Sequence, residues 1–498
     1  MLPCFLQGSH TDAQDIDSGR LFLRRFQMHR IKNEVIQKMQ LLKTTQEMFR
    51  DKSFLSKAVT IALPVALQGM LNTIVNLVDT MMIGTLGETA IAAVGLANKV
   101  FFVFSLLVFG VASGSGVLAA QYWGNWDVKN IRKVLGLALI ISVTGALGFL
   151  IPAVVCPEAV MRIFTTSQGA ISVGVTYLVI VAFSYPFTAI TNTYVAILRS
   201  VGRVKAPVVI SCMTICINIC FNYIFIFGHF GAPAMGAPGA ALATLIARTV
   251  ECLAILAVTY GTRSPLACHV RELFGYSRAF LKQIASNTGP VIANEFMWGL
   301  GTTMYSLAYG RMGDNAVAAI TIATTIQDIV VVLFQGLSAA TAVVLGHELG
   351  GGKIRRAEKY ATNFFILQFL ASLFAMAVCF SIRGGIIGMY SITPEVAADV
   401  NLCLLVFILY LPAKSFNFVN IVGVLRSGGD TKVCLFIDTS GVWLIGVPMA
   451  FLGGLYFKQP IYIVYAMVLF EEVYKMVIGY GRYRQKRWLR NLNTELQE

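Results

Sequence analysis

Long apolar runs separated by short polar stretches dominate the chain and set its predicted secondary structure. Each run is long enough for a helix to cross the ~30 Å hydrocarbon core of a bilayer. The alternating apolar and polar residues of membrane-barrel strands are absent from the sequence. We therefore expect an all-α polytopic membrane protein with about twelve transmembrane helices. The predicted spans are 58–83, 90–121, 131–155, 170–197, 205–228, 237–260, 281–309, 316–346, 358–382, 395–424, 432–455 and 461–481.

The composition agrees with a chain that lies mostly in a bilayer. Of the 498 residues, 56% are hydrophobic and only 13% are charged, and the mean hydropathy is +0.70. A soluble domain of this size does not need so much apolar surface. The net charge of +14 would suit a nucleic-acid partner. The basic residues lie in short loops between the apolar runs, however, so we expect no nucleic-acid partner.

Basic residues are concentrated in every second loop, and this pattern predicts the orientation of the chain. An excess of Lys and Arg marks the cytoplasmic loops of a membrane protein. We therefore expect a multi-pass protein of the plasma (inner) membrane with both termini in the cytoplasm. The basic loops are 129–133, 199–205, 263–282, 353–359 and 426–432. The loops between them offer only Arg162, Arg311, Arg383 and Lys458.

The segments outside the spans are basic and polar. Residues 1–56 hold no apolar core of signal-peptide length, so we expect a cytosolic extension that lies on the anionic leaflet. Met28 or Met39 is an alternative first residue. Residues 485–498 are predicted to form a cytosolic tail.

The two halves of the chain resemble each other at a spacing of 226 residues. With one more residue, LRSVGRVK (198–205) falls on LRSGGDTK (425–432). An even number of spans in each half gives both halves the same topology. We therefore expect two six-helix lobes, 57–262 and 281–484, related by an axis along the membrane normal and joined by the cytosolic linker 263–280. Residues that coincide at this spacing include Pro64 with Pro290, Gly110 with Gly336, and Gly124 with Gly350.

The first span carries an acid, Asp79, inside an apolar run. An aspartate in a span costs ~2.5–3.5 kcal/mol on insertion scales, and by default it faces a protein interior or a wet cavity. We therefore expect a cavity wall here. The alternative is an acid at the outer interface that reaches into water. The polar residues within roughly 80° of one helix face are Gln68, Asn72, Asn76 and Asp79.

The fifth span has a polar stripe on one face. Asparagine supplies neutral oxygens to a cation and amide donors to a carboxylate, so Asn218 and Asn222 are candidate partners of a coupling ion. Hydrogen bonding between helices is the alternative. The stripe consists of Ser211, Thr214, Asn218 and Asn222, with the cysteines 212, 216 and 220 opposite as expected packing residues.

Glu295 lies near the middle of the seventh span, with Trp298 and Tyr305 on the same side. A glutamate beside aromatic rings suits an organic cation or a proton. The alternative is a structural ion pair with Lys414 in the tenth span.

Two further polar residues of the second half are candidates to line the cavity. Asp328 is expected to be a third buried acid, and Asn417 follows Lys414 by one turn. In the first half, Arg248 and Glu251 lie three residues apart in one span, so we expect them to neutralise each other.

Enzyme signatures are absent from the sequence, which contains no HExxH, no GxSxG, no Walker loop and no acidic cluster suited to magnesium. We therefore expect a protein that is not an enzyme and that needs no cofactor and no metal. The one exception would be Na⁺ at Asp79, Asn218 and Asn222.

Four stretches together resemble the multidrug and toxic compound extrusion (MATE) transporters, over roughly residues 55–484. They are VDTMMIG after LPVALQ, INICFNYIFIFGHFGAP in the fifth span, PVIANE in the seventh span and the paired LRSxGxxK loops. Asp79, the pair Asn218–Asn222 and Glu295 are the residues that carry the resemblance.

The resemblance implies two lobes that form a V and alternate access. It implies an N-lobe cation site at Asp79, Asn218 and Asn222, and it assigns Glu295 to a C-lobe site. The chain departs from the family in the tenth span, where Ser415 stands in place of an aspartate found in members with a C-lobe cation site. We therefore expect ion coupling in the N-lobe.

The function that follows is secondary antiport by a monomer. Uptake of H⁺ or Na⁺ at Asp79 would drive export of hydrophobic, cationic organic compounds, and a carboxylate with amide oxygens suits either ion. The alternative is a lipid-linked saccharide flippase of related fold. That function needs a strongly basic cavity for pyrophosphate, whereas only scattered bases, among them Lys99, Arg248 and Lys414, lie within the predicted spans.

Overall fold

The computed structural model describes residues 45–262, 264–390 and 392–494. The chain forms two compact units, Met1–Ser56 and Lys57–Glu498. In the first unit, residues 45–50 are helical and the first long helix begins at Lys52. The rest of the predicted cytosolic extension lies outside the described residues.

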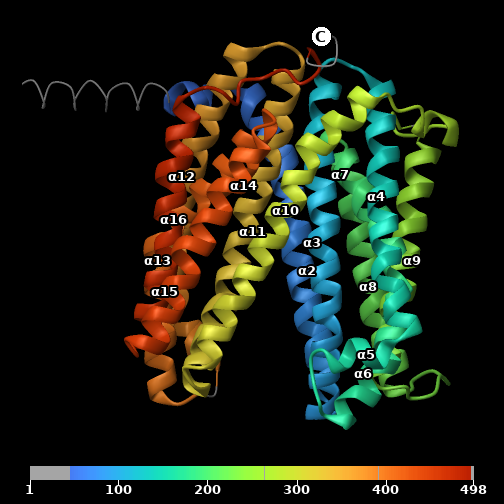
Figure 1. The fold of residues 1–498 in the computed structure, drawn as a ribbon, viewed down its shortest axis with the longest axis vertical. Coiled ribbons are helices and arrows are strands. Elements are labelled where there is room, and N and C mark those ends of the chain that lie inside the picture. Colours follow the sequence, from blue (N-terminus) through green and yellow to red (C-terminus); the bar gives the residue numbers. More distant parts are fainter. Residues whose placement is uncertain (1–44, 263, 391, 495–498) are drawn as a thin grey trace, which may run out of the picture. The chain divides into compact units, whose positions relative to one another are not determined.

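The first half of the second unit consists of six helical rods of membrane length, joined by short turns (Figure 1). One rod, α6–α7, is bent by 45°. The bend has a local cause, because Pro186 has no N–H to donate to the carbonyl one turn earlier. The helices are α2 (Lys52–Gly84), α3 (Glu88–Gly124), α4 (Val128–Val155), the short α5 (Pro157–Arg162), α6 (Gln168–Ala182), α7 (Ser184–Ser200), α8 (Lys205–Phe227) and α9 (Ala237–Gly261).

The second half also consists of six rods, after the short 3₁₀ turn Val270–Leu273. Two of its rods contain π-helical turns, which insert an extra residue per turn into an otherwise α-helical rod. The helices are α10 (Arg278–Gly310), α11 (Asp314–Gly350), α12 (Ile354–Ile387), α13 (Pro394–Asn417) with the π-helical continuation Phe418–Leu425, α14 (Thr431–Ser440) and α15 (Val447–Phe451) in one rod with the π-helical segments Gly441–Gly446 and Leu452–Tyr456, and α16 (Ile461–Arg484).

The length and composition of these rods fit a membrane protein. Over the described ranges, nine helices could cross a bilayer, or ten if α6–α7 is one span. The other two rods, α10 and α16, have 33 and 24 residues, but they are more polar, with Glu295 in α10 and Glu471, Glu472 and Lys475 in α16. The predicted fold class is confirmed: the protein is an all-α polytopic membrane protein of two six-helix lobes.

Each lobe has its own apolar core. In the N-lobe, Phe104 of α3 stacks on Tyr185 of α7 with ring centroids 4.8 Å apart, and both are fully buried. In the C-lobe, Phe407 of α13 and Val464 of α16 occupy the corresponding interior. These two clusters each lie within one lobe, as is typical of lobes that move relative to each other.

The lobes pack against each other through equivalent helices. Gly110 of α3 lies so close to α10 that a Cβ there would be 2.7 Å from Cα of Ile292. Gly336 of α11, its counterpart in the repeat, lies equally close to α2, where a Cβ would be 2.6 Å from the carbonyl oxygen of Ala62. Positions that are equivalent in the sequence repeat therefore form equivalent contacts across the interface between the lobes.

The closest approach lies where α3 and α11 end, here called the Gly124 end. Gly124 contacts the carbonyl group of His347, and Gly350 contacts the carbonyl group of Gln121, at distances that leave no room for a Cβ on either glycine. In Figure 1 the ribbons of the two lobes approach at this end and diverge toward the opposite one, where α2 and α10 end. We call the opposite end the Gly87 end, after the turn between α2 and α3.

Residues 488–494, here called the C-terminal strap, lie across both lobes at the Gly124 end. Gln121 of α3 donates to the backbone carbonyl of Ser427 (2.6 Å) and accepts from the backbone N–H of Leu492 (2.7 Å). Gln283 of α10 donates to the carbonyl of Leu492 (2.7 Å). The strap thus forms hydrogen bonds with both lobes through the side-chain amides of Gln121 and Gln283.

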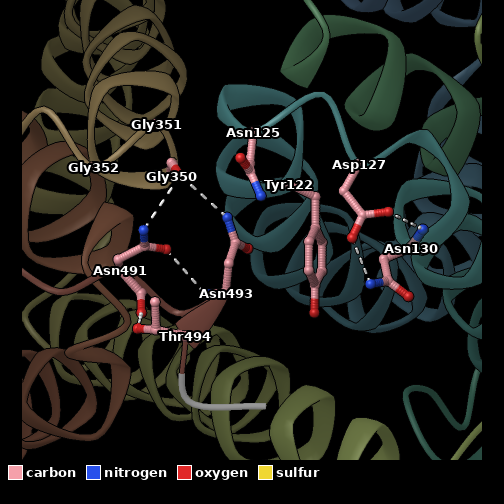
Figure 2. A pocket seen from close by; sticks show the side chains of 10 residues that line it. All are labelled: Tyr122, Asn125, Asp127, Asn130, Gly350, Gly351, Gly352, Asn491, Asn493 and Thr494. Carbon is pink, nitrogen blue, oxygen red and sulfur yellow. Dashed lines mark hydrogen bonds between the residues drawn. The ribbon is translucent and has the colours of Figure 1, made fainter. Parts of the chain in front are cut away.

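The strap also borders a cavity of about 340 Å³ between the helix ends. Figure 2 shows Asn491 and Asn493 turned toward Gly350, whose carbonyl accepts from both side chains (3.3 and 3.4 Å). Tyr122 and Asp127 of the N-lobe line the same cavity. The carboxylate of Asp127 caps the start of α4 and is therefore already engaged.

Candidate functional site

The structure brings together the acid of the first span and the amides of the fifth. Asn222 of α8 donates from Nδ2 to Oδ1 of Asp79 on α2 at 2.6 Å. The same amide lies 3.4 Å from Oδ1 of Asn218, one turn earlier on α8. Asn218 and Asn222 are buried, and Asp79 is half-buried. The predicted trio therefore forms one polar cluster between two helices.

The oxygen atoms of this cluster suit a hard cation or a proton. Oδ1 of Asn222 is buried and has no hydrogen-bond partner in the described part of the chain. With the carboxylate of Asp79 and the amide oxygen of Asn218, it offers the oxygen ligands that hard cations prefer. Within residues 45–262, 264–390 and 392–494, no group of three His, Cys, Asp or Glu side chains could hold a metal ion.

Gln68 and Asn72 share the polar face of α2 but lie away from this cluster. Gln68 donates to Oγ of Ser211 at 2.9 Å, and Asn72 lines the same small cavity. Gln68 precedes Asp79 by three turns, or ~16 Å along the helix. The polar face of α2 therefore contributes residues to two separate polar sites in the N-lobe, the cluster around Asp79 and the small cavity beside Gln68.

Glu295 has a different partner from the one that the sequence suggested. Arg426 donates to its carboxylate at 3.0 Å, and both residues are buried. A second guanidinium nitrogen of Arg426 donates to Oγ of Ser113 on α3 at 3.1 Å. The alternative, an ion pair of Glu295 with Lys414, has the wrong partner, because Arg426 at the end of the tenth rod extends its side chain into the bundle.

Lys414 instead belongs to a second group of charges centred on α16. Its ammonium group lies 3.5 Å from Glu472, which also accepts from Asn417 at 2.8 Å. Tyr305 donates to Glu471 at 2.6 Å. The candidate residues Lys414, Asn417 and Tyr305 are thus brought together, but around acids of α16 rather than around Glu295.

Lys475 links this second group to α14. Its ammonium group lies 3.4 Å from Glu471 and 4.0 Å from Asp438, and Asp438 accepts from Asn294 at 3.0 Å. Asn294 precedes Glu295 on α10, so the two groups of charges are adjacent. The network contains four acids (Glu295, Asp438, Glu471, Glu472) and three bases (Lys414, Arg426, Lys475).

Two other candidate residues join neither cluster. Asp328 of α11 is exposed rather than buried, which corrects the sequence-based expectation. It lies one turn from Val332, which packs against Gly69 of α2, so it lies on the side of α11 that faces the N-lobe. Trp298 of α10 is 43% exposed.

The expected pair in the sixth rod is confirmed. Arg248 donates to Glu251 at 2.8 Å across one turn of α9. The same carboxylate accepts from Ser211 of α8 at 3.0 Å.

With this geometry established, comparison with known proteins decides the family. The MatE family model matches residues 64–224 and 290–452, which together make up more than half of the chain. The chain belongs to the MatE family. Its two matches begin 226 residues apart, which is the spacing of the repeat in the sequence.

Several MatE relatives align over most of their length. The chain is 23% identical over 443 residues to the "Uncharacterized transporter YisQ" of Bacillus subtilis (strain 168), covering 88% of this chain and 96% of the relative. It is 26% identical over 423 residues to the "Multidrug resistance protein PmpM" of Pseudomonas aeruginosa, covering 82% and 87%.

Solved MatE-type structures share the fold of this chain. One described as the outward-facing conformation of a multidrug resistance MATE family transporter has a TM-score of 0.79 at 20% identity, covering 89% of this chain and 96% of that one. A structure of MATE in the bent conformation also has a TM-score of 0.79 at 20% identity, covering 92% and 99%.

Sequence reasoning missed several charged residues of this MatE protein. Glu471, Glu472 and Lys475 fall within the last predicted span. Three charged residues in a stretch of five inside a span are unusual, and this pattern could have identified them as functional candidates. Asp438 lies inside the eleventh predicted span in the same way. Arg426 was placed in a loop by its neighbours Ser427, Gly428 and Gly429, although its side chain enters the bundle.

Proposed function

We propose that this protein is a secondary active antiporter that exports hydrophobic, cationic organic compounds in exchange for H⁺ or Na⁺ by alternating access. The observation that carries the proposal is the contact of the buried Asn222 with the half-buried Asp79, beside Asn218. A carboxylate held at this depth by amides can bind and release a cation with little rearrangement. Relatives named multidrug resistance proteins support the substrate class.

The distribution of charges supports an outward-facing state. The basic loops 129–133 and 353–359 follow α3 and α11, so the positive-inside rule assigns the Gly124 end and both termini to the cytoplasm. The lobes pack closely at that end through Gly124 and Gly350. We therefore propose that the protein, in the plasma membrane, is closed to the cytoplasm here and that Asp79 is reached from outside.

Ion uptake at Asp79 would drive the cycle electrostatically. A neutral carboxyl group no longer needs water around the polar face of α2. Neighbouring helices can therefore repack against that face, which weakens substrate binding. A membrane potential contributes ~2.3 kcal/mol per charge per 100 mV to each cycle. The exposed Trp298 and Asp328 on faces of α10 and α11 supply aromatic and anionic contacts suited to an organic cation.

The arrangement of basic groups argues against the flippase alternative. A flippase for a pyrophosphate-linked lipid would need cationic side chains free to meet the pyrophosphate. Here four bases inside the bundle are engaged by acids, in the pairs Arg248–Glu251, Lys414–Glu472, Arg426–Glu295 and Lys475–Glu471.

The test is transport by purified protein in liposomes. Ethidium and tetraphenylphosphonium would be the first probes, with a pH gradient and a sodium gradient imposed separately. Asp79→Asn should lower gradient-driven transport at least tenfold while probe binding, followed by fluorescence polarisation, stays within about threefold. Asp314→Asn, at the exposed start of α11, is the matched control and should transport like the parent. Undiminished transport by Asp79→Asn would remove the proposed mechanism.

A further inference from the structure

A small polar cavity lies inside the N-lobe, away from the cluster around Asp79. It has a volume of about 40 Å³ and lies between α2, α7, α8 and α9. Among the residues that line it are Gln68 of α2, Thr188 and Thr191 of α7, Ser211 of α8, and Arg248 and Glu251 of α9.

The chemistry of the cavity wall indicates that it holds water. The hydroxyl of Thr188 is buried and has no hydrogen-bond partner in the described residues, and that of Thr191 has only the weak thiol of Cys252 beside it. A buried hydroxyl without a partner is costly, so such groups normally bond to ordered water. The cavity has room for one or two water molecules, each with several polar partners.

A continuous polar stripe joins this cavity to the cluster around Asp79. It runs along α8 at intervals of four, four and three residues, so all its members lie on one helix face. From Asp79 to the cavity the stripe covers about 16 Å. It consists of Asn222, Asn218, Thr214 and Ser211, all of which are buried.

Glu251 stands at the inner end of the stripe and is the one carboxylate among the described residues that line the cavity. It is 5% exposed, and it accepts from Ser211 (3.0 Å) and from Arg248 (2.8 Å). The side chain of Arg248 is 40% exposed and lies near enough to act electrostatically on Asp79 as well. Besides Arg248, the titratable neighbour of Glu251 is the thiol of Cys252. The polar residues of α2, α7 and α8 that line the cavity present amides and hydroxyls to Glu251.

We propose that Glu251 and the water in this cavity form the inner half of a proton pathway, and that Glu251 receives the proton first taken up by Asp79. The proton leaves the carboxyl group of Asp79, moves through water along the α8 stripe, and binds an oxygen of Glu251 as that oxygen leaves Arg248. One O–H bond breaks and one forms, so no further reactant is needed. This inference rests on the proposed antiport and specifies H⁺ as the coupling ion.

A proton pathway through Glu251 and a purely structural role of Glu251 predict different effects on two transport activities. Net efflux driven by a pH gradient requires the proton to cross the N-lobe, whereas exchange of substrate for substrate across the membrane does not. Glu251→Gln keeps the size of the side chain and its capacity to bond Ser211, but it cannot carry a proton in this step. Only the first activity should therefore depend on an ionisable group at this position.

The experiment measures both activities in liposomes containing the full chain, with ethidium as the probe. Glu251→Gln is expected to lower pH-driven efflux at least tenfold and to leave ethidium exchange within twofold of the parent. Glu251→Asp is expected to restore part of the efflux. Glu158→Gln removes an exposed acid paired with Arg162 in the same lobe, and it should change neither activity.

Two outcomes would overturn the pathway. If Glu251→Gln retains pH-driven efflux, the proton does not pass through it; if efflux and exchange fall together, Glu251 only holds α8 and α9 in place. Asp79→Asn separates this inference from the proposed function. An inactive Asp79→Asn beside an active Glu251→Gln removes the pathway alone, whereas an active Asp79→Asn removes the coupling mechanism itself.

Discussion

Arg426 and Glu295 form a buried ion pair at 3.0 Å, and the same guanidinium group bonds Ser113 of the other lobe at 3.1 Å. One cation therefore neutralises the acid of α10 and holds α3 beside it. The charge of Glu295 and the packing of the two lobes are thus connected through a single side chain.

Removing that cation should destabilise the protein strongly. Arg426→Met leaves Glu295 charged and unpaired in the interior, at a cost of about 3–5 kcal/mol. We expect a clear fall in the unfolding temperature of the protein in detergent micelles. The double variant Arg426→Met with Glu295→Met removes both charges and should recover most of the loss. A single variant as stable as the parent would contradict a buried pair.

A methyl group on Gly350 should open the lobe interface at the Gly124 end. Its Cβ would collide with the carbonyl oxygen of Gln121, and such overpacking costs about 1–3 kcal/mol. Spin labels at Asn130→Cys and Lys353→Cys would then show longer distances between the lobes. Gly148→Ala in α4 is the control, because a Cβ there meets no atom within 4 Å. Unchanged distances in Gly350→Ala would count against a tight contact.

Loss of the Gln121 side chain should release the C-terminal strap. Gln121→Ala leaves the carbonyl of Ser427 and the N–H of Leu492 without their present partners, at a cost of about 1–3 kcal/mol. The population open at the Gly124 end should rise about tenfold, which the same pair of spin labels measures. Thr494→Ala is the control, because that hydroxyl bonds only within the strap. Equal distances in both variants would argue against a tie between lobes.

Two cysteines outside the helices test the orientation and the burial of the loops. Cys156 is exposed after α4, at the Gly87 end, so a membrane-impermeant maleimide should label it in intact cells. Burial raises the pKa of the Cys268 thiol, although Arg132 opposes the shift. Its thiolate should therefore form only at a higher pH than that of a free cysteine, whose pKa is ~8.5.

The measurement uses versions that keep a single cysteine each. Alkylation of Cys268 by iodoacetamide in permeabilised cells should be slow at neutral pH and should accelerate only in more alkaline buffer. Labelling of Cys156 in inverted vesicles but not in intact cells would reverse the assigned orientation.

The N-lobe cluster could be predicted from the sequence because each helix carries its polar residues on a single face. Such faces predict a cavity wall on each helix, and the resemblance to the MATE transporters implied that Asp79 of α2 and Asn222 of α8 belong to one site. The spacing of Pro64 and Pro290 similarly predicted two equivalent lobes. Helical periodicity and the internal repeat can be identified from the sequence alone, without knowing how the side chains pack.

The C-lobe network could not be predicted in the same way. Long side chains such as that of Arg426 can extend several ångströms from their backbone, so a residue at the end of a rod, beside a polar loop, can still neutralise a buried acid. The pairing of Lys414 with Glu472 depends on which faces of α13 and α16 meet, which neither helix specifies alone. Asp328 shows the converse, since a span that looks buried along its length can leave one side chain exposed.

The C-terminal strap has a consequence for the order of assembly. Its residues follow both lobes in the chain, so they leave the ribosome after the lobes have been made, and domains generally fold as they emerge. Gln121 and Gln283 therefore lack their hydrogen bonds with Leu492 until translation reaches that residue. Until then the lobes are held together only by their direct contacts, such as those of Gly110 and Gly336, and the strap adds its hydrogen bonds after both lobes have been synthesised.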